Sequence, residues 1–139
     1  MPKLDQTAGT ERRNARLAGD LIAWLGTTRP DGRPHVVPVW FVWDRETLLV
    51  LSQPETQKVR NLGANPLVTL ALDDTRQGKD VVIVDGVAST SSKSPPTRLL
   101  DAYIAKYAGV LAEMEWSPEA YLAEYTQAIL IRPTRFLDW

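Results

Sequence analysis

The fold of this chain is decided by residues 22–43, which read IAWLGTTRPDGRPHVVPVWFVW. The first part of this stretch is apolar and partly β-branched, and it predicts a strand over residues 20–28. Residues 30–32, Pro-Asp-Gly, predict a turn, because proline presets φ and the Asp-Gly pair tolerates the left-handed conformation. A second strand, rich in Val, Phe and Trp, is expected over residues 35–43. Consecutive strands joined by a short turn indicate an antiparallel hairpin.

The rest of the chain continues the alternation of short strands, turns and helices. Further strands are expected over residues 47–51, 67–72, 81–87 and 128–132. Helices are expected over residues 11–19, 52–62 and 95–108, with a last short one that begins at 117–119 and uses Ser117 as its cap. Thr10 is the expected cap of the first helix. Mostly antiparallel strands with few helices predict a small, mainly β (α+β) barrel covered by helices.

Composition predicts a single soluble domain over residues 1–139. Hydrophobic residues make up 44% of the chain and charged residues 24%, which is typical of a globular protein. The net charge of −1 gives no reason to expect a nucleic-acid partner. No apolar run approaches the roughly 20 residues that a membrane helix needs, and the polar N-terminus does not resemble a signal peptide. We therefore expect a cytoplasmic protein without a membrane partner.

The residue types present narrow the possible chemistry. The chain contains no cysteine, which excludes disulfides, thiolate metal sites and a cysteine nucleophile. Its one histidine is His35, so a metal site built from several histidines is impossible within one chain. His35 follows the predicted hairpin turn, where a histidine is more typical of a strand end than of a proton donor. We therefore expect no catalytic side chain and no metal site.

The predicted strand 35–43 is the first candidate for a binding site. Both of its faces are largely apolar, so both are expected to be covered. Pro38 lies in its middle and cannot donate to a ladder, which places it on a sheet edge or at a break in pairing. Such a break would leave backbone groups free to bond the edge of a flat heterocycle. The same pattern fits an ordinary buried edge strand, and these residues leave both interpretations open.

The second candidate is the segment 52–65, SQPETQKVRNLGAN. Polar and cationic side chains gather around its predicted helix N-terminus: Ser52, Thr56, Lys58 and Arg60. Ser52 and Glu55 have the spacing of a capping box. Free amides and the helix dipole favour an anion there, and phosphate is the obvious one. A capped surface helix with solvated charges fits the same pattern.

Three stretches together form a recognisable pattern. They are Ile22–Thr27 with Asp31–Phe41, then Thr56, Lys58, Asn61, Leu62, Asn65, Pro66 and Val68, and finally Arg132–Arg135. In order and spacing, over about residues 15–135, they resemble the first hairpin, the helix with the fourth strand, and the closing strand of pyridoxamine 5′-phosphate oxidase-like proteins. Within that family the chain is most similar to the branch of F420-dependent oxidoreductases.

This resemblance implies an antiparallel split β-barrel with flanking short helices, which forms a homodimer with two cofactor sites at its interface. It implies coenzyme F420 as the cofactor, with FMN as the alternative. Backbone groups of Val37, Pro38 and Val39 would flank the ring system. The residues implied near the phosphate are Ser52, Thr56 and Lys58, with Arg60 and Asn61 close by. The anionic tail of F420 would also suit the two cations, Lys58 and Arg60.

The implied chemistry is hydride transfer to a small unsaturated substrate. The cofactor would supply the reactivity, and the protein would supply binding, orientation and exclusion of water. The extended C-terminal segment of true pyridoxamine phosphate oxidases is not apparent, so vitamin B6 oxidation is not expected. Two alternatives stay open: an FMN-binding oxidoreductase of the same fold, and a non-catalytic cofactor carrier or ligand-binding module.

Overall fold

The computed structural model describes residues 6–73 and 75–139. The helices in these residues are α1 (Gln6–Gly19), α2 (Gln57–Ala64), α3 (Thr97–Glu113) and α4 (Pro118–Glu124). The strands are β1 (Ala23–Thr28), β2 (Pro34–Val39), β3 (Val42–Trp43), β4 (Leu48–Ser52), β5 (Leu67–Leu72), β6 (Val82–Ser91) and β7 (Gln127–Asp138). Among the described residues, no helix is long and apolar enough to cross a membrane.

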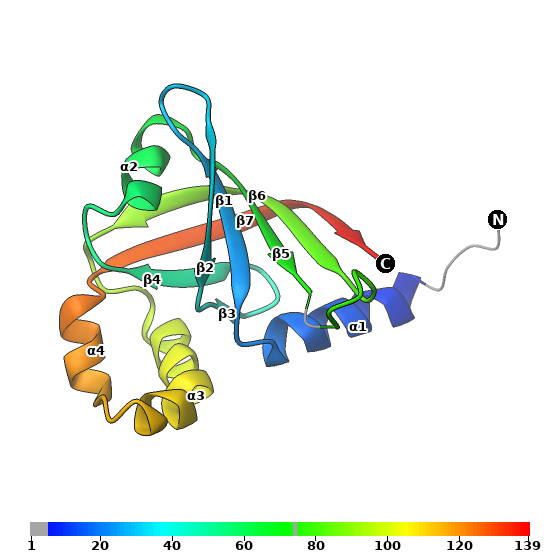
Figure 1. Ribbon diagram of the computed structural model, residues 1–139. Coiled ribbons are helices and arrows are strands. Elements are labelled where there is room, and N and C mark those ends of the chain that lie inside the picture. The colour runs from blue at the N-terminus through cyan, green and yellow to red at the C-terminus, as the bar shows by residue number, and fades with distance from the viewer. Residues whose placement is uncertain (1–5, 74) are drawn as a thin grey trace.

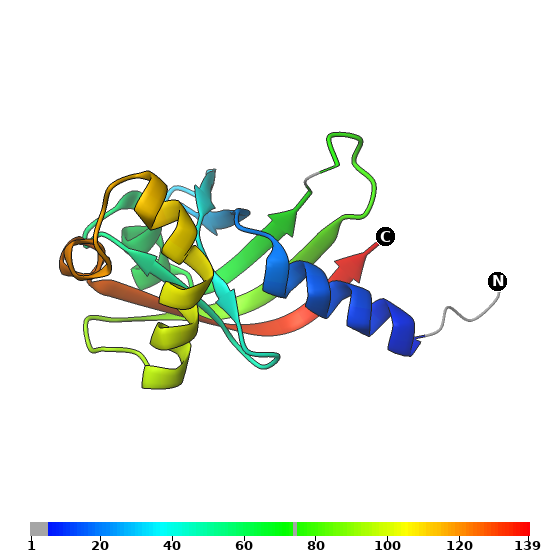
Figure 2. The ribbon, with the colours of Figure 1, turned by 90° about the horizontal axis from the view of Figure 1, so that it is seen from below.

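The strands form one antiparallel sheet in the order β2-β1-β5-β6-β7-β4-β3. The sheet curls into a partly open barrel, with α3 and α4 together at one end of it and α1 at the other (Figures 1 and 2). Strands β2 and β3 are neighbours in the chain but lie on opposite edges of the sheet. This arrangement confirms the predicted mainly β split barrel with flanking short helices.

Strand β4 is buried along its whole length because it separates two apolar clusters. Leu48 and Val50 point into the barrel, where they pack with residues such as Leu25. The alternate residues Leu49 and Leu51 belong to the second cluster, which lies between the sheet and helices α3 and α4. Successive side chains of a strand point to opposite faces, so β4 connects the barrel core to the helical layer.

The predicted strand 35–43 is in fact two strands, which separate at Trp40 and Phe41. The Phe41 N–H donates to the Tyr107 hydroxyl at 2.8 Å, and the Phe41 carbonyl accepts from Lys106 Nζ at 2.9 Å. Tyr107 and Lys106 of α3 therefore bond the Phe41 backbone groups that a neighbouring strand would otherwise bond. The expectation of one continuous strand was wrong because α3 is distant in sequence. The expectation that Pro38 lies on an edge is confirmed, because β2 is an edge strand.

Several element ends also differ from expectation. Thr10 lies inside α1 and is not its cap, because the helix begins at Gln6. Strand β7 continues past 132 to Asp138, paired with β6. Pro133 is accommodated there because it lies opposite Gly86, where the register shifts. Other ends were placed too early: β6 continues to 91 rather than 87, and α3 to 113 rather than 108.

The Tyr107 hydroxyl is expected to matter for stability. Tyr107→Phe should lower the free energy of unfolding by about 1–3 kcal/mol, because the buried Phe41 N–H would lose its acceptor. The ring that stacks on Trp40 at 4.6 Å would remain, so the loss would report on the hydroxyl. Urea melts of both proteins would measure the difference. An unchanged midpoint would contradict the assignment. Lys106→Met, which leaves that N–H bonded, is the control and should cost less.

Candidate functional site

A cleft of about 280 Å³ lies where the β2–β3 junction, the start of α2 and the α3–α4 corner meet. It is lined by Ile22, Pro38, Val39, Trp40, Leu51, Lys58, Met114, Trp116, Tyr121 and Tyr125. Most of these side chains are apolar or aromatic. Lys58 carries the one formal charge among the described residues of this lining. The cleft therefore brings together both sequence candidates, the strand with Pro38 and the helix with Lys58.

The edge-strand residues contribute to the cleft unequally. Pro38 and Val39 line it, whereas the Val37 side chain packs against the barrel core. Val37 could therefore contribute to a ligand through its backbone alone. An edge strand has one side without a neighbouring strand in its sheet, and its backbone groups on that side are available to other partners.

The start of α2 differs from the predicted capping box. The helix begins at Gln57 with Thr56 as its N-cap, and Glu55 has a φ of +63°. Residues in the left-handed region do not continue a helix, so the Ser52–Glu55 capping box was wrong. The Thr56 side chain accepts no capping hydrogen bond from a backbone N–H of the helix. Its hydroxyl instead lies 3.2 Å from the buried Ser52 hydroxyl and accepts from Lys58 Nζ at 3.4 Å.

The remaining two predicted residues point elsewhere. Arg60 is exposed, and it donates to the Glu55 carbonyl at 2.6 Å and to Gln57 Oε1 at 2.7 Å. Asn61 is fully buried, and its Nδ2 donates to Thr27 Oγ1 at 2.9 Å. Asn61 thus fastens α2 to β1 and does not line the cleft. His35 also lies outside the cleft lining.

The electrostatics of the cleft favour an anion. Burial lowers the pKa of Lys58, because desolvation disfavours its charged form. An anion beside Nζ would favour that charge and raise the pKa again. Burial also raises the pKa of Tyr121 to about 12, and its hydroxyl lies 2.8 Å from that of Tyr103. Tyr121 is therefore neutral near pH 7 and adds no negative charge to the wall.

The aromatic wall of the cleft was not predicted from the sequence. Its members are Trp40, Trp116, Tyr121 and Tyr125, with Met114 beside them.

Ser117 accepts from the Ala120 N–H at 3.1 Å, which confirms the predicted cap of α4. The spacing of Tyr121 and Tyr125 by four residues puts both rings on one face of α4. This four-residue spacing was the sequence signal for the aromatic wall, but the same spacing is equally typical of two residues in a core contact.

A turn at the end of α3 places Trp116 in this wall. The Trp116 N–H donates to the Leu111 carbonyl at 2.9 Å, and the Glu115 N–H donates to the Ala112 carbonyl at 3.1 Å. These two bonds form a Schellman motif, which requires a left-handed residue after the helix. That residue is Glu115, with a φ of +56°. Glycine is the usual residue at this place because a side chain is strained there.

Glu115→Gly is therefore expected to raise the free energy of unfolding by about 1 kcal/mol, because it relieves the strain of a left-handed side chain. Urea melts would measure the gain. Glu113→Gly, inside the last turn of α3, is the matched control and should instead destabilise by about 0.5–1 kcal/mol. Destabilisation by both variants would contradict this account of the turn.

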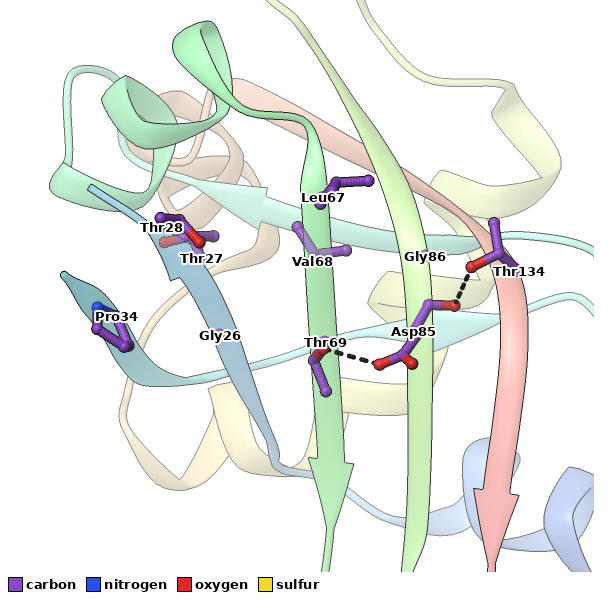
Figure 3. Close-up of a pocket in the computed structure, with 10 residues that line it drawn as sticks. All are labelled: Gly26, Thr27, Thr28, Pro34, Leu67, Val68, Thr69, Asp85, Gly86 and Thr134. Carbon is purple, nitrogen blue, oxygen red and sulfur yellow. Dashed lines mark hydrogen bonds between the residues drawn. The ribbon is translucent and has the colours of Figure 1, made fainter. Parts of the chain in front are cut away.

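A second, larger hollow of about 500 Å³ lies over strands β1, β5 and β6 (Figure 3). There Thr69 donates to Asp85 Oδ1 at 2.8 Å, and Thr134 donates to the Asp85 carbonyl at 3.2 Å. None of the predicted site residues lines it. The same side of the sheet exposes Val36 and Leu67, at 58% and 60% of their surfaces. This hollow is part of an exposed sheet face that combines apolar residues with threonines and Asp85.

The sequence profile described as pyridoxamine 5′-phosphate oxidase matches residues 10–139 of this chain. The chain belongs to this family. As a member of the pyridoxamine 5′-phosphate oxidase family, it is similar to a solved F420 reductase with 29% identity and a TM-score of 0.66. That match covers 89% of this chain and 94% of the reductase.

More distant structures share the fold of this family member. HutZ, the heme storage protein from Vibrio cholerae, is 20% identical with a TM-score of 0.69, over 96% of this chain and 93% of HutZ. A conserved hypothetical protein from Mycobacterium tuberculosis is 22% identical with a TM-score of 0.71, over 98% of this chain and 84% of that one. At these identities the likeness concerns the fold alone.

Proposed function

We propose that this protein is an oxidoreductase that binds coenzyme F420 and transfers hydride to a small unsaturated substrate. The observation that carries the proposal is the cleft in which edge-strand residues Pro38 and Val39 meet the half-buried cation Lys58. Membership of the pyridoxamine 5′-phosphate oxidase family supports it, as does the 29% identity to an F420 reductase.

The residues at the start of α2 suit the phosphate of the cofactor. Thr56 is the N-cap of the helix, but its side chain makes no hydrogen bond to a helix amide. Lys58 Nζ lies 3.4 Å from the Thr56 hydroxyl. The first amides of a helix and its dipole favour an anion, and a lysine adds a charge-assisted bond. Ser52 orients Thr56 through the contact between their hydroxyls. Asn61 holds the helix in place from the opposite side.

The ring system is assigned to the edge strand. Backbone groups of Val37 and Val39 would bond the edge of the ring, and Pro38 would pack against it without competing as a donor. The cofactor would supply the hydride, and this chain would bind it, orient it and exclude water. Arg60, exposed and outside the cleft, would add only a weak, screened attraction towards the anionic tail of F420.

A homodimer completes the proposal. Strand β2 presents Pro34, Val36 and Pro38 outwards as exposed residues, and the neighbouring β1 exposes 49% of Trp24. An exposed apolar face of this kind marks an interaction site. A second copy packed on it would bury more than about 2,000 Å² in total, as obligate dimers do. By the family resemblance, the cofactor sites would lie at such an interface.

Titration of the purified protein with F420, FMN and hemin would test the cofactor. We expect F420 to bind, followed by absorbance and fluorescence, and turnover when the reduced cofactor is supplied with a panel of unsaturated substrates. Binding of FMN alone would favour the FMN oxidoreductase. Binding of F420 without any turnover would favour a cofactor carrier. Binding of hemin alone would overturn the proposed cofactor.

His35 is expected to be dispensable for the reaction. His35→Asn should leave turnover within about tenfold, or roughly 1.4 kcal/mol of barrier, because the cofactor itself carries the hydride. Steady-state rates at saturating F420 would measure this. A loss of three orders of magnitude, with folding and F420 affinity intact, would instead make His35 a proton donor.

A further inference from the structure

The aromatic cluster beside the cleft has a buried base and an open rim. Tyr103, Tyr107 and Tyr121 are almost fully buried and form the base. Trp116 and Tyr125 are half-buried at the rim, and both line the cleft. Neither ring is fully covered by the rest of the cluster, and both border the cleft. The rim therefore offers aromatic surface to a ligand.

The rim rings are held in a fixed arrangement. Tyr125 stacks on Tyr121 with centroids 4.3 Å apart and an angle of 14° between the rings. Trp116 meets Tyr121 and Tyr125 edge-on, at 5.5 Å and 5.9 Å. Trp40 also stacks on the base, with its ring centroid 4.6 Å from that of Tyr107 and 5.3 Å from that of Tyr121. Because the Schellman turn at Glu115 sets the backbone of Trp116, this ring is positioned before any ligand arrives.

We propose that this rim is the subsite for the hydride acceptor, and that the acceptor is a planar, conjugated molecule of one or two rings. The inference rests on the proposed function and adds the substrate class to it. A planar ring stacks on, or meets edge-on, the rings of Trp116 and Tyr125. The whole cleft measures about 280 Å³, at the small end of ligand pockets, and the cofactor ring would take the part beside Pro38 and Val39, so a small acceptor is expected.

The lining gives the acceptor no charged partner, because Lys58 is assigned to the cofactor phosphate and the other described residues of the lining are uncharged. In the reaction, a carbon of a conjugated double bond gains the hydride and becomes reduced. A proton from water then reaches the conjugated oxygen or the adjacent carbon. The reduced F420 of the proposed function is the reductant and becomes oxidised.

The test uses the F420-loaded protein and two probes of similar size and equal charge. They are 2-naphthoate and its saturated analogue decalin-2-carboxylate. We expect calorimetry to show that 2-naphthoate binds at least about tenfold more tightly than the analogue. Trp116→Leu and Tyr125→Leu should each weaken 2-naphthoate by about tenfold and leave the affinity for F420 within about twofold. Trp139→Leu, just beyond the end of β7 and outside the cleft lining, is the control and should change neither.

The outcomes separate this inference from the proposed function. Equal affinity for 2-naphthoate and its saturated analogue, with F420 still bound, would overturn the subsite and leave the cofactor assignment intact. Unchanged 2-naphthoate binding in both rim variants would do the same. Competition between F420 and 2-naphthoate would overturn the subsite by showing that the ring of the cofactor occupies the rim. Failure of F420 to bind while 2-naphthoate binds to the rim would overturn the proposed function and the hydride-acceptor role, and would leave the rim as a site for planar rings.

Discussion

Val36→Asp combined with Leu67→Asp is expected to convert the proposed homodimer into a monomer. Both side chains lie on the exposed sheet face, at 58% and 60% of their surfaces. Burying a large apolar side chain contributes about 1.5–3 kcal/mol, and each substituted carboxylate would add the cost of burying a charge. Two sites in each of two copies would weaken the dimer by well over 4 kcal/mol, or more than about a thousandfold.

Light scattering at micromolar concentration would measure the change, with the wild type expected as a dimer. Ala108→Asp with Ala112→Asp adds the same charge on the exposed side of α3 and is the control, expected to stay dimeric. A monomeric wild type would contradict the proposal. A dimer lost only in the α3 variant would place the interface on that helix. The sheet variant should also lose F420 affinity, because the cofactor sites are proposed to lie between the two copies.

Lys58→Ala is expected to weaken F420 binding by about tenfold to a hundredfold, or roughly 1.4–2.7 kcal/mol. The reason is the loss of a charge-assisted bond to phosphate from a lysine that burial already leaves poorly solvated. The difference from wild type should shrink at high salt, because exposed parts of the contact are screened. Fluorescence titration at two ionic strengths would measure both effects.

Arg60→Ala is the matched control for Lys58→Ala. It removes the same charge from the same helix, but the Arg60 guanidinium is bound to the Glu55 carbonyl and to Gln57 outside the cleft. We expect it to change F420 affinity by less than about threefold. Neither variant should destabilise the cofactor-free protein much. Unchanged binding of both F420 and FMN by Lys58→Ala would remove the phosphate site from α2.

Much of the fold was predictable from short stretches of sequence, because local rules control them. The Pro-Asp-Gly turn and the β-branched runs predicted the first hairpin, and β1 and β2 pair as expected. Pro38 indicated an edge strand because proline cannot donate to a ladder, and β2 is an edge strand. Ser117 indicated a helix cap and acts as one. Each of these inferences depends on residues close together in the chain.

The candidate site depended on contacts between residues far apart in the chain. The break at Phe41 occurs because Tyr107 and Lys106 of α3 take over its backbone hydrogen bonds. The helix pattern around Lys58 could not show which side chains face the cleft; folding turned Lys58 into it and Arg60 away from it.

The sequence by itself therefore determined most of the strand pattern, the position of Pro38 at an edge or a break in pairing, and the set of polar residues near α2. The tertiary structure alone decided that Lys58 shares a cleft with Trp116 and Tyr125. The physical reason is that hydrophobic periodicity and turn residues act over a few positions, whereas a cleft is made where distant elements pack. The aromatic rim could not be predicted from the sequence, because it forms where α3 and α4 pack against β4.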